Sequence, residues 1–180
     1  MPDQWLMLNY TLPREPSRLR VGVWRKLKKL GAASLAQSMW VLPDRQGLRA
    51  ALETLKSEIV TQGGEAMLMS ASVDAQSEHD FIARLGAARD EEYTEVLEQC
   101  ADFMEEMEKE TARRNFSFAE IEENETELYK LRQWHATIAA RDFFGAGLQA
   151  KSAAALEECA AALEVFCEQV YESTEETRRD

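Results

Sequence analysis

Cationic side chains are concentrated in one short stretch of this chain. Between Arg14 and Lys29 there are seven Lys or Arg residues and one acid, although the 180-residue sequence has a net charge of -12. Lys and Arg bind phosphate and other oxyanions through charge-assisted hydrogen bonds, and Arg does so with a fork of parallel donors. The stretch therefore predicts contact with an anion, either a nucleic-acid backbone or a small oxyanion.

The remaining charge is distributed unevenly. Residues 1–75 hold ten basic and seven acidic side chains, a net charge of +3, whereas residues 76–180 hold eleven and twenty-six, a net charge of -15. A basic part and an acidic part repel and attract different partners. We therefore expect two parts with separate electrostatic roles.

Catalytic signatures are absent from the sequence. It contains no Gly-rich phosphate loop, no Gly-x-Ser-x-Gly turn and no Cys-x-x-Cys pair, and neither His79 nor His135 lies near a nucleophile in the sequence. We expect no enzyme activity and no cofactor. No apolar run approaches the roughly 20 residues that span a bilayer, and the first residues lack the basic start of a secretory signal. We predict a cytoplasmic protein without membrane contact.

Three cysteines, Cys100, Cys159 and Cys167, do not form a disulfide pattern and suit a reducing compartment, so core packing is the favoured interpretation. The acidic block Glu120–Glu127 lacks the glycine and the spacing of an EF-hand, and a solvated helix face is favoured over a metal site. His135 lies on an apolar stripe and is interpreted as a partly buried histidine with a hydrogen-bond partner.

The first 75 residues alternate between strand and helix patterns. Gln4–Leu12 has a period-2 apolar face typical of a strand. Ser17 is a candidate helix cap, and an apolar side then recurs at helical spacing until Gly31. Trp24 lies on that side and is expected to brace the helix against the sheet, and Arg20 is a cation among apolar positions. The opposite side carries five cations: Arg18, Arg25, Lys26, Lys28 and Lys29.

Further strands and a second helix follow. Ser38–Leu42 is expected to be a strand, with Ala33–Gln37 as its candidate hairpin partner. A second amphipathic helix runs over residues 48–59 and ends at Gly63-Gly64, and Ala66–Ser72 supplies a last strand. The order predicts a ferredoxin-like βαββαβ sandwich over residues 1–75, with both helices on one face of the sheet.

Residues 76–180 show long helical periods without strands. A helix from about Ser77 is interrupted at Asn115–Phe118, a second ends near Gly145, and a third covers Leu148–Glu172. Three such helices are expected to pack as an antiparallel bundle or a helical hairpin extension. The fold class predicted for the whole chain is therefore α+β.

Several blocks of the sequence, taken in order, resemble the N-terminal region of the ChrB family of bacterial chromate-resistance proteins. They are W-L-M-L-N-Y-T-L-P, R-V-G-V-W-R-K-L-K-K-L-G-A, M-W-V-L-P-D, E-E-Y, F-A-E-I-E-E-N-E-T-E-L-Y-K-L-R-Q-W and R-D-F-F-G. Full-length members also carry a C-terminal chromate-resistance domain, so this chain looks like a stand-alone N-terminal module or a shortened piece. The first half is similar, more distantly, to the ferredoxin-like central domain of PaaX-type repressors, a fold shared with CRISPR-associated endonucleases.

The resemblance implies a regulator of chromate-resistance genes that binds operator DNA and responds to chromate. Arg18, Arg25, Lys26, Lys28 and Lys29 are the expected DNA contacts, and they imply binding to the backbone because no helix-turn-helix pattern accompanies them. From the residues alone, a solvated helix face explains these cations equally well. A homodimer that aligns two basic helices would reduce the repulsion of DNA by the acidic part.

Two other interpretations remain open. Arg14, Arg18 and Arg20 near the start of the basic helix, and Arg141 beside Asp142, are candidates for binding an oxyanion such as chromate. An Arg-Asp pair at a helix end is more often a structural clamp. Phe143 and Phe144 are interpreted as apolar plugs at the end of the bundle. The alternative function is a non-catalytic interaction module whose acidic helices dock on a separate chromate-resistance domain or a transporter partner.

Overall fold

The computed structural model describes residues 4–179, with side chains described up to residue 175. The chain forms two compact units. The first extends to Ala88 and also includes Arg141–Ala146, and the second contains Arg89–Ala140 and the residues from Gly147 onward. The sequence predicted two independent domains that divide at residue 75, and that division stays a prediction.

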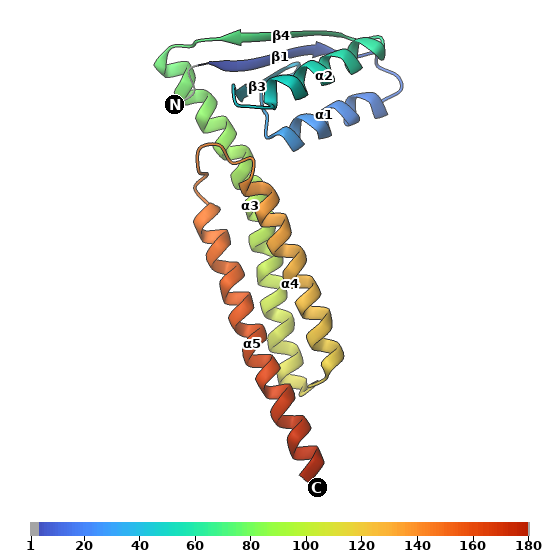
Figure 1. The fold of residues 1–180 in the computed structure, drawn as a ribbon, viewed down its shortest axis with the longest axis vertical. Helices are drawn as coiled ribbons and strands as arrows, with labels where there is room; N and C mark the ends of the chain where they lie inside the picture. Colours follow the sequence, from blue (N-terminus) through green and yellow to red (C-terminus); the bar gives the residue numbers. More distant parts are fainter. Residues whose placement is uncertain (1–3, 180) are drawn as a thin grey trace. The chain divides into compact units, whose positions relative to one another are not determined.

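The first unit contains a four-stranded antiparallel sheet in the order β2-β3-β1-β4 (Figure 1). The elements follow one another along the chain as β1 (Trp5–Thr11), α1 (Arg18–Leu30), β2 (Ala33–Ala36), β3 (Met39–Pro43), α2 (Leu48–Thr61) and β4 (Glu65–Ala71). β2 and β3 pair directly, which confirms the predicted hairpin. The α+β class and the βαββαβ order are thus confirmed.

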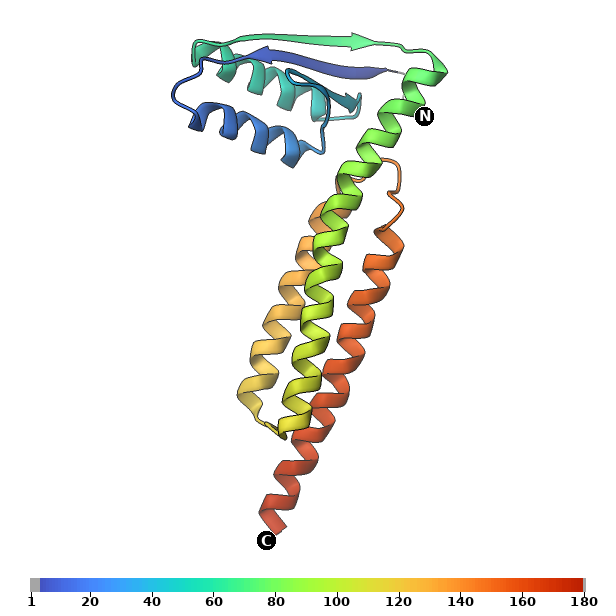
Figure 2. The ribbon, with the colours of Figure 1, turned by 180° about the vertical axis from the view of Figure 1, so that it is seen from behind.

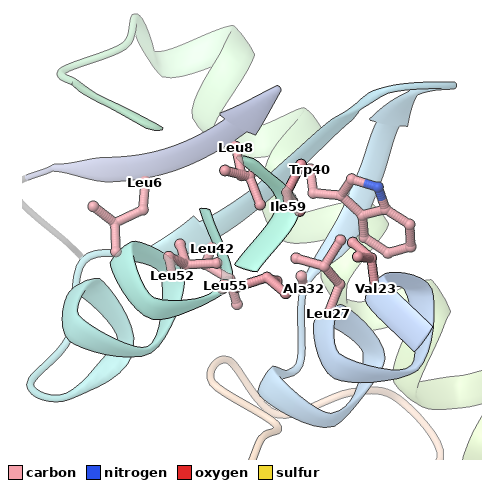
Figure 3. Close-up of a cluster of buried hydrophobic side chains, with 10 residues drawn as sticks. All are labelled: Leu6, Leu8, Val23, Leu27, Ala32, Trp40, Leu42, Leu52, Leu55 and Ile59. Carbon is pink, nitrogen blue, oxygen red and sulfur yellow. The ribbon is translucent and has the colours of Figure 1, made fainter. Parts of the chain in front are cut away.

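Both helices cover the same face of the sheet, as the period-2 pattern of β1 requires. Leu6 and Leu8 point from β1 into a buried cluster, where they meet apolar side chains of both helices (Figure 3). The rest of this buried cluster comes from α1, the residue after Gly31, β3 and α2: Val23, Leu27, Ala32, Trp40, Leu42, Leu52, Leu55 and Ile59. One core therefore positions α1 on the sheet.

The opposite face of the sheet is partly covered by the first turns of a long helix. Trp5, on the other face of β1 from Leu6, belongs to a second buried cluster with Val41 and Leu85. Phe81 meets the Trp5 ring edge-on at a centroid distance of 5.2 Å. These contacts assign the start of that helix to the first unit.

Three long helices complete the chain: α3 (Ala75–Arg113), α4 (Phe118–Ala139) and α5 (Gln149–Arg179). In the second unit they run side by side (Figure 2), and the connection from α4 to α5 passes through the first unit at Arg141–Ala146. The predicted interruption at Asn115–Phe118 separates α3 from α4, and Ser117 caps α4, because its hydroxyl accepts a hydrogen bond from the Glu120 N–H at 3.3 Å. Within the described residues, no helix is both long enough and apolar enough to cross a membrane.

The ends of the predicted helices differ from the structure in two places. α4 ends at Ala139, not near Gly145, and α5 continues past Glu172 to Arg179. The earlier end of α4 has a visible cause, because Arg141–Ala146 packs against the first unit and cannot continue a helix of the second. Phe143 and Phe144 continue the apolar pattern of α4 in the sequence, but they lie beyond the end of the helix.

Candidate nucleic-acid interface

α1 is fixed by its buried side and by the hydrogen bonds at its C-terminal end. Val23 and Leu27 are its buried positions, and Gly31 ends it in a left-handed conformation with φ 84°. The Gly31 N–H donates to the Lys28 carbonyl at 2.9 Å, and the Ala32 N–H donates to the Leu27 carbonyl at 3.0 Å. Ser17 occupies the first position but its side chain accepts no capping hydrogen bond, so that part of the prediction was wrong.

Three of the predicted DNA contacts form a row on the exposed side of α1. At about 100° per residue, Arg18, Arg25 and Lys29 fall within an arc of roughly 40°. All three are exposed. Within the part of the chain that the structure describes, none of the three forms an ion pair. We call these three residues the cationic stripe.

The other two predicted DNA contacts have different surroundings. The Lys26 ammonium forms an ion pair with the Glu58 carboxylate on α2, which partly neutralises its charge. Lys28 is half-buried. The stripe therefore supplies three freely available charges, and Lys26 and Lys28 are secondary candidates.

A groove adjoins the stripe on α1. It lies between α1, the end of β1 and the β2–β3 hairpin, has a volume of about 590 Å³, and is lined in part by Tyr10, Arg20, Val21, Trp24, Gln37 and Trp40. We call it the aromatic groove. Trp24 is 47% exposed and Val21 is 43% exposed. The Trp24 indole is therefore not buried between α1 and the sheet, where it was expected to brace the helix, and it lines the groove instead.

The groove also explains Arg20, which sequence reasoning left as a cation among apolar positions. Arg20, Val21 and Trp24 share one side of α1 and line the same groove. Burial raises the pKa of the Tyr10 phenol, and the neighbouring Trp40 partly opposes that shift. The phenol is accordingly protonated at neutral pH and can donate a hydrogen bond.

The four candidate oxyanion ligands do not converge on one place. Arg14, Arg18 and Arg20 are exposed near the start of α1. Arg141 lies at the other end, where its guanidinium donates to the Lys28 carbonyl at 3.3 Å. A helix of 13 residues is about 20 Å long, so Arg141 cannot share a small anion with the other three. Arg141 is positioned as a clamp on the end of α1.

The segment around Arg141 closes the first unit. Phe143 packs on the cluster beneath the helices, and Phe144 packs on the second cluster and stacks on Trp5 at 5.8 Å. Arg45 donates to the Phe143 carbonyl at 2.8 Å and lies over both phenyl rings. The two phenylalanines therefore plug the α/β unit, and their predicted place at the end of the bundle was wrong. Sequence reasoning missed Arg45, whose partners lie far away along the chain.

Comparison with known proteins identifies the family of this chain. Residues 20–177 match the family model described as "Protein ChrB, N-terminal". The chain belongs to the ChrB N-terminal family. A relative named Protein ChrB, from Cupriavidus metallidurans, is 30% identical over 145 residues, which is 78% of this chain and 40% of the relative. The chain thus spans about two fifths of the length of the curated relative it matches.

The ChrB N-terminal match covers the stripe residues Arg25 and Lys29, the groove residues Arg20 and Trp24, and the Arg141 segment. Arg14 and Arg18 precede the matched range. The family assignment therefore includes the part of α1 that combines exposed cations with an exposed indole.

Elsewhere in this ChrB N-terminal chain, His135 and the acidic block of α4 have the surroundings expected of structural residues. His135 is half-buried, its Nδ1 lies 3.0 Å from the Ser152 hydroxyl, and burial lowers its pKa. This confirms the interpretation of His135 as a partly buried histidine with a hydrogen-bond partner. Glu123 and Glu127 are exposed, and among the described side chains no group of His, Cys, Asp and Glu is arranged to hold a metal ion.

Proposed function

We propose that this ChrB N-terminal chain is a regulatory module that binds DNA through the cationic stripe of α1 and whose DNA binding responds to chromate. The observation that carries the proposal is the row of exposed charges at Arg18, Arg25 and Lys29, none of which is neutralised by an acid in the described structure. The family supports the context of chromate resistance, because the curated relative bears the name ChrB.

The stripe has the chemistry for backbone contact. Two guanidinium groups and one ammonium along a single helix side can neutralise successive phosphates and release their condensed counterions. Contacts to phosphates fix where a protein lies on DNA but do not read the bases. The stripe on α1 is therefore expected to provide affinity and position, and not base readout. Base specificity would then come from other parts of the chain or from DNA shape.

The decisive experiment is fluorescence anisotropy with DNA from upstream of the chain's own gene, at two salt concentrations and with unrelated DNA as competitor. The variant Arg18→Gln, Arg25→Gln, Lys29→Gln is expected to weaken binding at least tenfold and to reduce the slope of log affinity against log salt by up to about three. Retained, salt-sensitive binding in this variant would refute the assignment to α1.

A matched control removes the same charge elsewhere. Lys130, Arg132 and Lys151 are exposed on the helical unit, and their replacement by Gln changes the net charge by the same amount. Binding by this control is expected to equal that of the unchanged protein at moderate salt. Chromate, with sulfate as the comparison anion, is added to the DNA complexes of the unchanged protein and of the control variant, and specific release by chromate is the expected response. Arg14, Arg18 and Arg20 are the proposed ligands for the anion.

A second candidate function is an interaction module, and it too has a supporting observation. The relative is more than twice as long as the segment that matches, so that protein has a large further part outside the region that resembles this chain. In the helical unit, Phe118 and Tyr171 form an edge-to-face pair although both are about half exposed. A partner domain would bury these rings. Co-purification with a separate C-terminal-type domain, lost in Phe118→Ser, Tyr171→Ser, tests this role.

A further inference from the structure

The aromatic groove beside the cationic stripe is a site in its own right. Its floor and walls include Tyr10, Trp24 and Trp40, which come from three different elements of the first unit. The hairpin turn is held against the end of β1 by the Tyr10 N–H, which donates to the Ser38 carbonyl at 3.0 Å. The groove is therefore built on the sheet and does not depend on a loose loop.

The exposed indole of Trp24 is the feature of the groove that indicates a ligand. On α1 the other exposed positions are mostly charged, and only Val21 joins Trp24 as a large exposed apolar side chain of this helix. Leaving an indole half in water is unfavourable, because its apolar surface remains hydrated. A flat ligand that stacks on the indole removes that surface from water.

The polar groups of the groove narrow the class of ligand. Arg20 supplies a planar guanidinium, Gln37 supplies an amide that both donates and accepts, and the Tyr10 phenol can donate. No carboxylate belongs to the described lining. Planar faces for stacking, hydrogen-bonding groups for a heteroatom-rich edge and a positive rim together match a nucleobase attached to a phosphate chain.

The position of the groove relative to the stripe supports the same ligand. On the helix projection Trp24 lies about 100° from Arg25, with Val21 between them. A nucleic-acid backbone that follows Arg18, Arg25 and Lys29 therefore passes beside the groove opening. One base can leave the backbone and enter the groove while the phosphates stay on the stripe.

We propose that the aromatic groove binds an unpaired nucleobase of the nucleic acid whose backbone contacts the cationic stripe, with Trp24 as the stacking platform. This inference rests on the proposed function for the phosphate contacts and adds a ligand that the basic helix alone does not explain. Stacking tolerates all bases, so the groove provides affinity for unpaired strands more than sequence selection.

The test uses the full chain and three probes of one length: a mixed-sequence single strand containing 2-aminopurine, a fully abasic strand, and the paired duplex. Trp24→Leu keeps an apolar side chain and removes the indole. This variant is expected to bind the base-bearing strand about tenfold more weakly and to bind the abasic strand and the duplex unchanged. Quenching of 2-aminopurine fluorescence on binding is expected with the unchanged protein and lost with Trp24→Leu.

The control is Tyr129→Leu, which alters an aromatic residue on α4 that is 64% exposed, more than Trp24. It should change neither the affinities nor the quenching. If Trp24→Leu matches the unchanged protein on all three probes while neutralising the stripe weakens duplex binding, the groove proposal is wrong and the proposed function stands. If no probe is bound even at low salt, both are wrong. If the groove instead binds a peptide or another ligand, Trp24→Leu is expected to bind all three probes like the unchanged protein.

Discussion

At the scale of single residues, the buried thiols illustrate how position decides chemistry. Cys159 and Cys100 come from different helices, yet the Cys159 thiol lies 3.6 Å from the Cys100 carbonyl oxygen. Burial raises the pKa of Cys159 to about 12, and it also raises the pKa of Cys100. Because the thiolate is the form that oxidants and alkylating agents attack, this pair is protected in the folded chain.

The protection gives a prediction about thiol labelling. In the folded protein at pH 8, Cys167 is expected to react first with iodoacetamide because it is only half-buried, and Cys100 and Cys159 are expected to react at least tenfold more slowly. Mass spectrometry of tryptic peptides over time measures the three rates separately. Unfolding in urea should make the rates similar. Labelling of Cys159 in the folded state as fast as Cys167 would contradict the assignment.

At the scale of elements, the junction between α1 and the Arg141 segment depends on a glycine. Gly31 has a φ of 84°, and a Cβ placed on it would lie 3.0 Å from the Cβ and the carbonyl oxygen of Arg141. Gly47 has a similar φ of 86° but nothing within 4 Å of such a Cβ. The two positions therefore share the backbone strain and differ only in crowding.

This pair makes a controlled prediction for stability. Gly47→Ala is expected to lower the free energy of unfolding by about 1 kcal/mol through the left-handed conformation alone. Gly31→Ala is expected to cost about 1–2 kcal/mol more, because Arg141 and Phe143 must also move. Urea denaturation followed by circular dichroism compares the two. Equal losses would show that the Arg141 segment does not pack on the end of α1.

The same junction marks the limit of what could be predicted from the sequence. The strands, the hairpin and the two short helices follow from local periodicity and from Gly31 and Gly63, so their order could be predicted. The apolar spacing of the first helix correctly indicated a side that faces the core, and Val23 and Leu27 on that side are buried. The groove was not predicted, because Trp24 was assigned by hydrophobicity to the side that the sheet covers. Arg20 carried the missing signal, since a cation at an apolar position implies that this side reaches water.

At the scale of the whole molecule, long-range packing is what local patterns cannot supply. Phe143 and Phe144 have the same apolar character whether they close a helical bundle or a distant sheet, and Arg45 donates to the Phe143 carbonyl across 98 positions of sequence. Nothing in their immediate neighbours selects between the two sites. Net charge can be predicted without knowing the packing, because it is a sum over residues. The division into a basic first part and an acidic remainder is therefore visible in the sequence itself.

That charge asymmetry allows one experiment to separate the two candidate functions. Glu122, Glu123 and Glu127 are exposed on α4. Replacing all three by Gln reduces the long-range repulsion of DNA, so DNA affinity is expected to rise two- to fivefold near 0.05 M salt and to be unchanged near 0.3 M, by an order-of-magnitude screening argument. If the chain is an interaction module, the three acids belong to its contact surface. The same variant is then expected to bind a C-terminal-type domain more weakly.

The matched control for this variant replaces the same three residues by Asp, which keeps the charge and shortens the side chains. It is expected to leave DNA binding unchanged at both salt concentrations, and anisotropy titrations measure all three proteins side by side. An affinity increase that persists at high salt, or that also occurs in the Asp variant, would show that α4 acts on DNA by contact or shape and not through the net charge of the chain. Screened repulsion alone disappears when the Debye length falls below the distance between charges and DNA.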